Sequence, residues 1–331
     1  MLHIMRYFFV ENPESGSKKA HSIMADVEKS LKDRDDCVFI KTEYPFHATK
    51  IAKEIALEYG EDATIIACGG DGTLGEIASG VFGTRTAIAL LPMGSGNDFA
   101  RKIYGGISTA EIAKRFGFLS GNINAPITEI DCISVNESCC VNVMSLGLDT
   151  KILKIANKLT TKFQFLGSFA YKIAIVLGIF GELGTKAKFE LDIINDDGSE
   201  ETLTLNPNFT LAAFGNGSYY GGGFCPAKES KINDGIIDMC IADRLTLIQV
   251  PGIIGKYSKG IAHLTHPDIV TMYKVVGGRL CSVNDEPLDC NCDGNPIPSK
   301  IIDFKIIKNG LRLACFENEA LAQATVTKES V

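Results

Sequence analysis

The chain has 331 residues, 45% of them hydrophobic and 22% charged, which is typical of a globular protein with a full core, and this length suggests two domains. The formal net charge of −7 argues against a general nucleic-acid-binding protein, because neutralising a phosphate backbone needs a broad basic surface. The longest apolar run, residues 173–180, is too short to span a bilayer.

Eleven cysteines without a CxxC spacing predict reduced thiols in a cytoplasmic protein rather than a disulfide framework. Cys290 and Cys292 would lie on the same face of a strand, which leaves a metal pair as the weaker alternative.

Residues 1–126 alternate short apolar runs with helical patterns. Four runs predict buried strands, at 5–10, 37–41, 63–68 and 86–91. The stretches 18–32, 47–60 and 74–82 have apolar residues at helical spacing. Continuous apolar strands separated by helices predict a doubly wound α/β domain with a parallel sheet covered on both faces.

From residue 127 the chain changes to a succession of strands, which predicts a β-rich second domain, a sandwich or barrel, over 127–316. The expected strands are 127–135, 139–147, 187–195, 203–214, 236–243, 270–276, 279–284, 301–307 and 311–316. Turn residues at Asp196-Asp197-Gly198 and Asn309-Gly310 predict hairpins, and helical segments interrupt the strands near 149–180 and 246–260. The polar tail, 317–331, either frays or packs back on the first domain.

Three of the strands in the first domain end in unusual turns. These turns are ENPESGSK (11–18), GGDGT (69–73) and PMGSGND (92–98), and ligands of open α/β sheets bind at this edge. Thr73 and Glu76 fit a capping box, so a helix would start here with exposed N–H groups, which bind anions. A tight, well-capped turn would explain one such loop, but three on one edge favour a phosphate site. There is no GxxxxGK[ST] P-loop and no GxGxxG dinucleotide motif.

These motifs resemble the diacylglycerol-kinase-type lipid kinases of bacteria, which are related to sphingosine kinases and, more distantly, to NAD kinases. GGDGT (69–73) is similar to the signature of the wider group, and NPESG (12–16) and LPMGSGNDFAR (91–101) resemble two further nucleotide loops. The resemblance continues through 142–149, 214–228 and 231–238 to CDGNPI (292–297), which is similar to the family's late DGE motif. It therefore covers nearly the whole chain.

The resemblance implies a nucleotide-binding first domain, a lipid-substrate second domain and two cofactors, ATP and Mg²⁺. The ATP contacts that it implies are Asn12, Pro13, Glu14, Ser15, Gly16, Thr42, Gly69, Gly70, Asp71, Gly72, Thr73, Leu74, Gly75 and Ser95. It also implies a structural Mg²⁺ held by Asp234 and by the backbones of Lys231 and Ile236. Asp71 would organise metal and phosphates, and Asp293 would be the catalytic base.

The sequence departs from the family's pattern at two positions. Gly75 stands where relatives usually have Asn, and Asn295 replaces the acidic residue of the DGE motif. A different alignment would place the carboxylates at Asp285 and Glu286, but that stretch lacks the glycine. Without the resemblance, Asp293-Gly294 would be interpreted as a hairpin turn.

A basic stripe offers a place to meet a membrane. Lys151, Lys154, Lys158 and Lys162 recur at helical spacing, with apolar residues on another face. A solvated lysine face on a helix that packs on its own core is the more favoured interpretation.

We therefore expect a cytoplasmic lipid kinase, peripherally membrane-associated when acting, that converts diacylglycerol to phosphatidic acid. Alternatives are a kinase of the same fold for a sphingoid base, another lipid alcohol or NAD, and a non-catalytic nucleotide or lipid sensor. No nucleic-acid partner is expected, and a homodimer is left open.

Overall fold

The computed structural model describes residues 5–162, 173–174, 177–178, 181 and 183–316. The predicted tail, 317–331, lies outside the described residues, as does most of the expected helical segment after residue 162. No helix in the described part of the chain is both long enough and apolar enough to cross a membrane.

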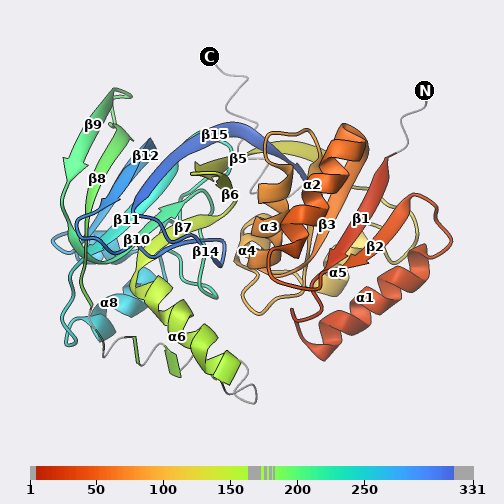
Figure 1. The fold of residues 1–331 in the computed structure, drawn as a ribbon, viewed down its shortest axis with the longest axis horizontal. Coiled ribbons are helices and arrows are strands. Elements are labelled where there is room, and N and C mark those ends of the chain that lie inside the picture. The colour runs from red at the N-terminus through yellow and green to blue at the C-terminus, as the bar shows by residue number, and fades with distance from the viewer. Residues whose placement is uncertain (1–4, 163–172, 175–176, 179–180, 182, 317–331) are drawn as a thin grey trace.

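The first region is a parallel sheet with helices on both faces, as predicted (Figure 1). Its strands, in the spatial order β4-β3-β1-β2, are β1 (Arg6–Glu11), β2 (Cys37–Lys41), β3 (Ala63–Gly69) and β4 (Ala87–Pro92). Its helices are α1 (Lys18–Leu31), α2 (His47–Tyr59), α3 (Asp71–Val81), α4 (Asp98–Tyr104) and α5 (Thr109–Arg115), with a 3-10 turn η1 (Gly60–Asp62). Every residue of β3 and β4 is buried, as expected of central strands between two helical layers.

The second region is rich in antiparallel strands, again as predicted (Figure 1). Its strands are β5 (Ile127–Val135), β6 (Ser138–Cys140), β7 (Val143–Gly147), β8 (Thr185–Ile194), β9 (Glu200–Leu205), β10 (Asn208–Gly215), β11 (Ile237–Asp243), β12 (Val270–Ser282), β13 (Cys290–Cys292), β14 (Asn295–Pro296) and β15 (Ile301–Ala314). Its helices are α6 (Leu148–Lys162), α8 (Val250–Tyr257) and α9 (Ala262–Thr265). A second core of buried side chains, among them Phe189, Phe214 and Met239, lies inside these strands.

Two predicted hairpins had different outcomes. Gly198, with φ at 83°, turns the chain between β8 and β9, which pair antiparallel, so this hairpin is confirmed. The hairpin predicted at Asn309-Gly310 is wrong. These residues form an irregularity inside the single long strand β15, where the pairing with β5 shifts between Ile307 and Leu311.

Strand β15 extends from the second region back into the first. Its residues Arg312 and Leu313 pair in parallel with Ala87 and Ile88 of β4, and Leu313 packs in the first core. The strands of both regions are thereby joined in one continuous hydrogen-bonded sheet. The division at residue 127 stays a prediction.

Candidate active site

The three glycine-rich turns converge at the carboxyl edge of the first sheet. The N–H of Asn12 donates to the carbonyl of Cys68 (3.0 Å), and that of Met93 donates to Gly69 (2.7 Å). A Cβ built on Gly94 would lie 2.6 Å from the Cα of Gly70, so the two backbones touch and neither position has room for a side chain. The predicted meeting of the turns is confirmed.

Helix α3 begins three residues earlier than the capping box predicts. Its N-cap is Gly70, which makes no side-chain cap, and Asp71 is the first helical residue. Glu76 accepts a hydrogen bond from the N–H of Ala48 (3.2 Å) at the start of α2. The predicted capping box is therefore wrong, because Glu76 stabilises a neighbouring helix. The N–H groups of the first turn of α3 have no partner within the helix, and such groups can bind an anion.

Asp71 lies at the centre of the converging turns and binds the start of α4. Its Oδ2 accepts from the N–H of Asp98 and its Oδ1 from the N–H of Phe99, both at 3.0 Å. Anionic groups are stabilising at a helix N-terminus. Asp71 is thus fixed by backbone donors while remaining half-buried rather than enclosed.

Asp98 is a second carboxylate at this point, which the sequence analysis did not assign to the site. Its Oδ2 accepts from the N–H of Gly222 (2.7 Å) in the second region, and its Oδ1 accepts from Arg101 (3.2 Å). Burial, reinforced by the neighbouring charge of Asp71, raises the pKa of Asp98 to about 6 against the opposing effect of the Gly222 N–H. The signal was its place at the end of PMGSGND, directly before a helix.

The second region contributes a turn, residues 293–295, that covers the first turn of α3. A Cβ on Gly294 would lie 3.7 Å from the nitrogen of Gly72, and the amide of Asn295 donates to the carbonyl of Gly72 (3.0 Å). The glycine turns and the predicted late motif, more than 200 residues apart in sequence, therefore share one site.

Asp293 is 6% exposed, and its carboxylate accepts hydrogen bonds from four donors. Its Oδ1 accepts from the N–H groups of Asn142 (3.0 Å) and Val143 (3.1 Å) and from the thiol of Cys140, and its Oδ2 from the N–H of Val141 (2.6 Å). Burial raises the pKa of Asp293 to about 6, although the backbone donors oppose that rise. The geometry makes Asp293 an anchor for residues 140–143.

The two departures from the family pattern lie side by side. A Cβ built on Gly75 would be 2.9 Å from the Cβ of Asp293 and 3.2 Å from the amide nitrogen of Asn295. A larger residue at 75 would therefore contact the Asn295 and Asp293 side chains directly. The alternative carboxylates, Asp285 and Glu286, are exposed.

The other residues predicted to contact ATP surround the same turns with different degrees of access. Asn12 donates to the hydroxyl of Thr73 (3.3 Å), and the N–H of Thr42 donates to the carbonyl of Glu11. Pro13, Glu14, Gly16 and Ser95 are exposed, whereas Ser15 is half-buried. The side chain of Leu74 is in the hydrophobic core, so only its backbone could meet a ligand.

A cavity of about 350 Å³ opens beside these turns. Ser17 and Lys19 line it from the start of α1, and Gly94 and Gly96 line it from either side of Ser95. Arg101 adds a second cationic group. The cavity therefore has backbone and cationic groups suited to an anionic ligand.

The predicted metal loop consists of oxygen donors with one carboxylate. Asp234 accepts from the N–H of Ile236 (3.1 Å), and burial, together with the charges of Asp238 and Asp131, raises its pKa. A divalent cation would relieve this crowding, and oxygen donors with few carboxylates suit Mg²⁺. The residues thus fit the ion. Among the described residues, no three His, Cys, Asp or Glu side chains gather as a metal-binding group, and all eleven cysteines are free.

Two lysines of the predicted basic stripe interact with other parts of the protein. Lys154 forms an ion pair with Asp289, and Lys151 donates to the carbonyl of Gly184 (3.5 Å). Lys158 is exposed, and the side chain of Lys162 lies outside the described residues. Ile152 and Ala156 on the opposite face are buried.

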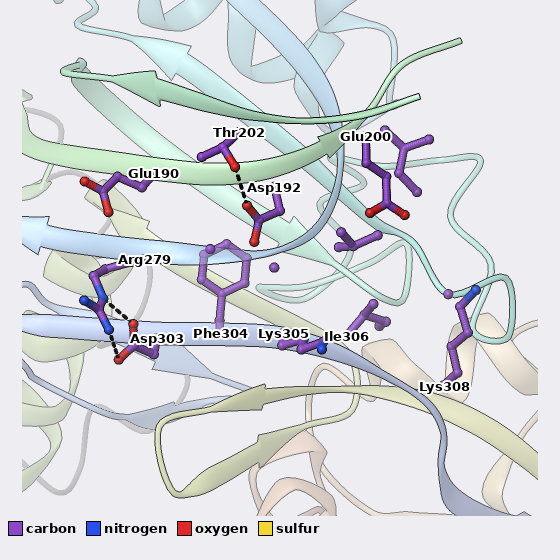
Figure 2. Close-up of a pocket in the computed structure, with 15 residues that line it drawn as sticks. Glu190, Asp192, Glu200, Thr202, Arg279, Asp303, Phe304, Lys305, Ile306 and Lys308 are labelled. Carbon is purple, nitrogen blue, oxygen red and sulfur yellow. Dashed lines mark hydrogen bonds and ion pairs between the residues drawn. The ribbon is translucent and has the colours of Figure 1, made fainter. Parts of the chain in front are cut away.

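A broad groove of about 740 Å³ lies elsewhere, over β8, β9, β12 and β15 (Figure 2). Its charged side chains are partly paired: Arg279 binds Asp303, and Asp192 accepts from Thr202. None of the predicted site residues lines it, so it supports no part of the candidate site.

Comparison with known proteins points to one family. Residues 6–135 match the model of the diacylglycerol kinase catalytic domain. A protein of Alcanivorax borkumensis named "Probable lipid kinase YegS-like" is 27% identical over 76% of this chain and 78% of its own length. One of the same name from Pseudomonas aeruginosa is 27% identical over 76% of both chains.

Solved structures support the same fold. The structure of a diacylglycerol kinase from Bacillus anthracis is 17% identical and covers 94% of this chain and 97% of its own, with a TM-score of 0.60. Another structure from that organism reaches a TM-score of 0.69 at 19% identity and covers 96% of this chain and 99% of its own. The resemblance predicted from the motifs is confirmed.

Proposed function

We propose that this chain, which is related to the diacylglycerol kinase catalytic domain family, is an ATP- and Mg²⁺-dependent kinase that phosphorylates the primary hydroxyl of diacylglycerol to phosphatidic acid. One observation carries the proposal. In a chain whose residues 6–135 match that family, three glycine-rich turns meet the 293–295 turn of the β-rich region at the start of α3.

The first region would bind the nucleotide phosphates. Backbone N–H groups at the start of α3 and in the turns at 12–16 and 94–96 provide donors without bulk, which phosphoryl transfer needs for positioning and charge stabilisation. Asp71 and Asp98 lie together on the side of the site that faces Gly222. Asp71, with Asp98 beside it, would organise the metal ion and the phosphates.

The second region would supply the base. Asp293 is the proposed residue, and a pKa of about 6 is suitable for a base that acts near neutral pH. Its Oδ2 accepts a single backbone hydrogen bond and faces Gly75, where a Cβ would lie 3.4 Å away. The absence of a side chain at 75 leaves this oxygen as the one that an acceptor hydroxyl could approach.

Mg²⁺ would be held by Asp234 and by the carbonyls of Lys231 and Ile236, where it would neutralise charge between the two regions. Asp131 supports this loop by accepting from the N–H groups of Gly235 (2.6 Å) and Asn309 (2.9 Å). Lys102 adds a further link, since its ammonium donates to the hydroxyl of Ser218 (2.8 Å). At the membrane, Lys158 and its neighbours on α6 would contact anionic lipid from the cytoplasmic side.

Purified protein incubated with labelled ATP and a panel of diacylglycerol, sphingoid base and NAD tests the proposal. We expect label in phosphatidic acid. Label only in a phosphorylated sphingoid base or in NADP would identify a kinase of the same fold for that acceptor. ATP binding without transfer to any acceptor would indicate a sensor.

Two matched variants test the residues. Asp293→Asn should lower turnover at least a hundredfold while nucleotide binding persists. Glu286→Gln, at an exposed carboxylate of the alternative alignment, should have no effect. Turnover near the wild-type rate in Asp293→Asn would remove Asp293 as the base.

A further inference from the structure

A lysine from β15 lies against the proposed metal loop, residues 231–236. Gly235 in this loop has φ at 76°, and a Cβ built on it would overlap Cε of Lys308 and lie 2.6 Å from its Nζ. The stem of Lys308 therefore packs directly on the loop backbone and brings its ammonium beside the loop. The same strand is tied to the loop, because Asp131 accepts from the N–H groups of Gly235 (2.6 Å) and Asn309 (2.9 Å).

The negative charge at this loop favours a nearby cation. Asp234 belongs to the loop, and burial, together with the charges of Asp238 and Asp131, raises its pKa. A cation beside these carboxylates is stabilising whether it is a metal ion or an ammonium group. Lys308 thus supplies from the chain itself the kind of charge that the loop would bind.

Another lysine near the loop, Lys102 of α4, is held in place. It is half-buried and donates to the hydroxyl of Ser218 (2.8 Å) and to the carbonyl of Ser230 (2.5 Å). Burial lowers the pKa of Lys102, and nearby acidic groups, Asp234 among them, oppose that change. Lys308, by contrast, is exposed, and its ammonium has no hydrogen-bond or ion-pair partner among the residues that the structure describes. Lys102 is therefore a fixed counter-charge, and Lys308 is one that can be displaced.

A displaced Lys308 has somewhere to go. It lines the broad groove over β8, β9, β12 and β15, and Gly235 lines the same groove, so the loop forms part of its wall. Figure 2 shows Lys308 at the opposite end of the groove from the ion pair of Arg279 and Asp303. Glu200 is among the other lining residues. An ammonium that leaves Gly235 can turn into this groove and stay in water near acidic side chains.

We propose that Lys308 is an internal counter-cation of the metal loop, which competes with the divalent ion and so sets the affinity of the loop for it. The inference rests on the metal loop of the proposed function and adds a residue outside its ligand set. Without the ion, the ammonium of Lys308 offsets part of the negative charge around Asp234. With the ion, two cations would face the same loop and repel each other, so Lys308 turns into the groove.

Titration of the nucleotide-free protein with Mn²⁺, followed by electron paramagnetic resonance, tests the competition without any turnover. Lys308→Met keeps the stem and removes the charge, so its Kd for Mn²⁺ should be about fivefold lower than that of the wild type. Lys308→Arg keeps the charge and should bind as the wild type does. Lys305→Met, at an exposed lysine of the same groove, is the matched control and should leave the Kd unchanged. An equal Kd in Lys308→Met and wild type overturns the inference, as does an equal change in Lys305→Met.

Thermal unfolding is an independent measurement of the same competition. In a chelator, Lys308→Met should unfold at a lower temperature than the wild type, because the carboxylates lose a counter-charge. Saturating Mg²⁺ should close this gap, since the variant gains more from the ion that it binds more tightly. A gap that does not depend on Mg²⁺ overturns the inference. Absence of Mn²⁺ binding in both proteins refutes this inference and the metal loop together, whereas transfer of label from ATP still decides the kinase activity.

Discussion

The two turns that meet at the start of α3 hold their carboxylates in opposite ways. Asp71, in the α/β region, accepts from two N–H groups that lie 27 and 28 residues later in the same region, and it stays half-buried. Asp293, in the β-rich region, is buried and accepts from three N–H groups that lie 150 to 152 residues earlier. One carboxylate borders a site, and the other also holds two distant segments together.

This difference predicts different consequences for stability and activity. The donors of Asp71 are the first two N–H groups of α4, and Phe99 and Ile103 of this helix pack in the first core, so α4 keeps its place without the carboxylate. The donors of Asp293 are the successive N–H groups of residues 141–143, where the chain passes from β6 into β7. Substitution of Asp293, the proposed base and an anchor, should therefore lower both activity and stability, whereas substitution of Asp71 should have a smaller effect on stability.

The largest expected effect is the loss of stability in Asp293→Ala. Three buried N–H donors would lose their acceptor, which should cost about 3–5 kcal/mol of unfolding free energy. Asp71→Ala takes the acceptor from two N–H groups instead of three and removes a half-buried carboxylate, so it should cost less, about 1–2 kcal/mol. Urea unfolding of both variants measures the difference, and equal costs would contradict the comparison.

Asp293→Asn separates charge from backbone strain in the same measurement. Asp293 has φ at 52°, a left-handed conformation that Asn tolerates better than Ala. The Asn variant should therefore be destabilised less than the Ala variant.

The dependence of this loss on pH provides the second test. Burial raises the pKa of Asp293 from 3.8 to about 6, so between these values the native state binds a proton that the unfolded state has released. The wild type thus loses stability as pH rises from about 4 to about 6, by up to about 3 kcal/mol from this group. Asp293→Asn lacks this titration. The unfolding free energy of the wild type should therefore exceed that of Asp293→Asn by more at pH 4.5 than at pH 8. An excess that grows with pH would contradict a raised pKa for Asp293.

The sequence predicted the α/β region more closely than the β-rich region, and the physical reason is the range of the contacts. The strand predicted at 37–41 matches β2 at both ends, because continuous apolar runs between helices depend on local pattern. The strands predicted at 270–276 and 279–284 are one strand, β12 (Val270–Ser282). Gly277 and Gly278 lie at an irregularity where β12 crosses β8, and long-range pairing carries the strand through them.

In the candidate site, too, the contacts between residues far apart in the sequence could not be predicted. The meeting of the turns at 12–16, 69–73 and 92–98 followed from parallel strands alone. The environment of Asp98 could not be predicted in this way, because Gly222, which donates a hydrogen bond to it, lies 124 residues later in the chain. Pattern alone cannot show which carboxylates become buried.

The smallest expected effect concerns Gly75, where the two turns touch. In an exposed helix, Gly→Ala stabilises by about 1 kcal/mol, and Gly255→Ala in α8, with no heavy atom within 4 Å of the added Cβ, is the matched control. At Gly75 the new methyl would lie 2.9 Å from the Cβ of Asp293, and overpacking costs about 1–3 kcal/mol. Gly75→Ala should therefore lose about 1 kcal/mol where Gly255→Ala gains. Adding Asn295→Ala, which removes the amide 3.2 Å away, should recover part of that loss in urea unfolding. Strictly additive effects of the two substitutions would mean that α3 and the 293–295 turn are not packed as tightly as the contact distances require.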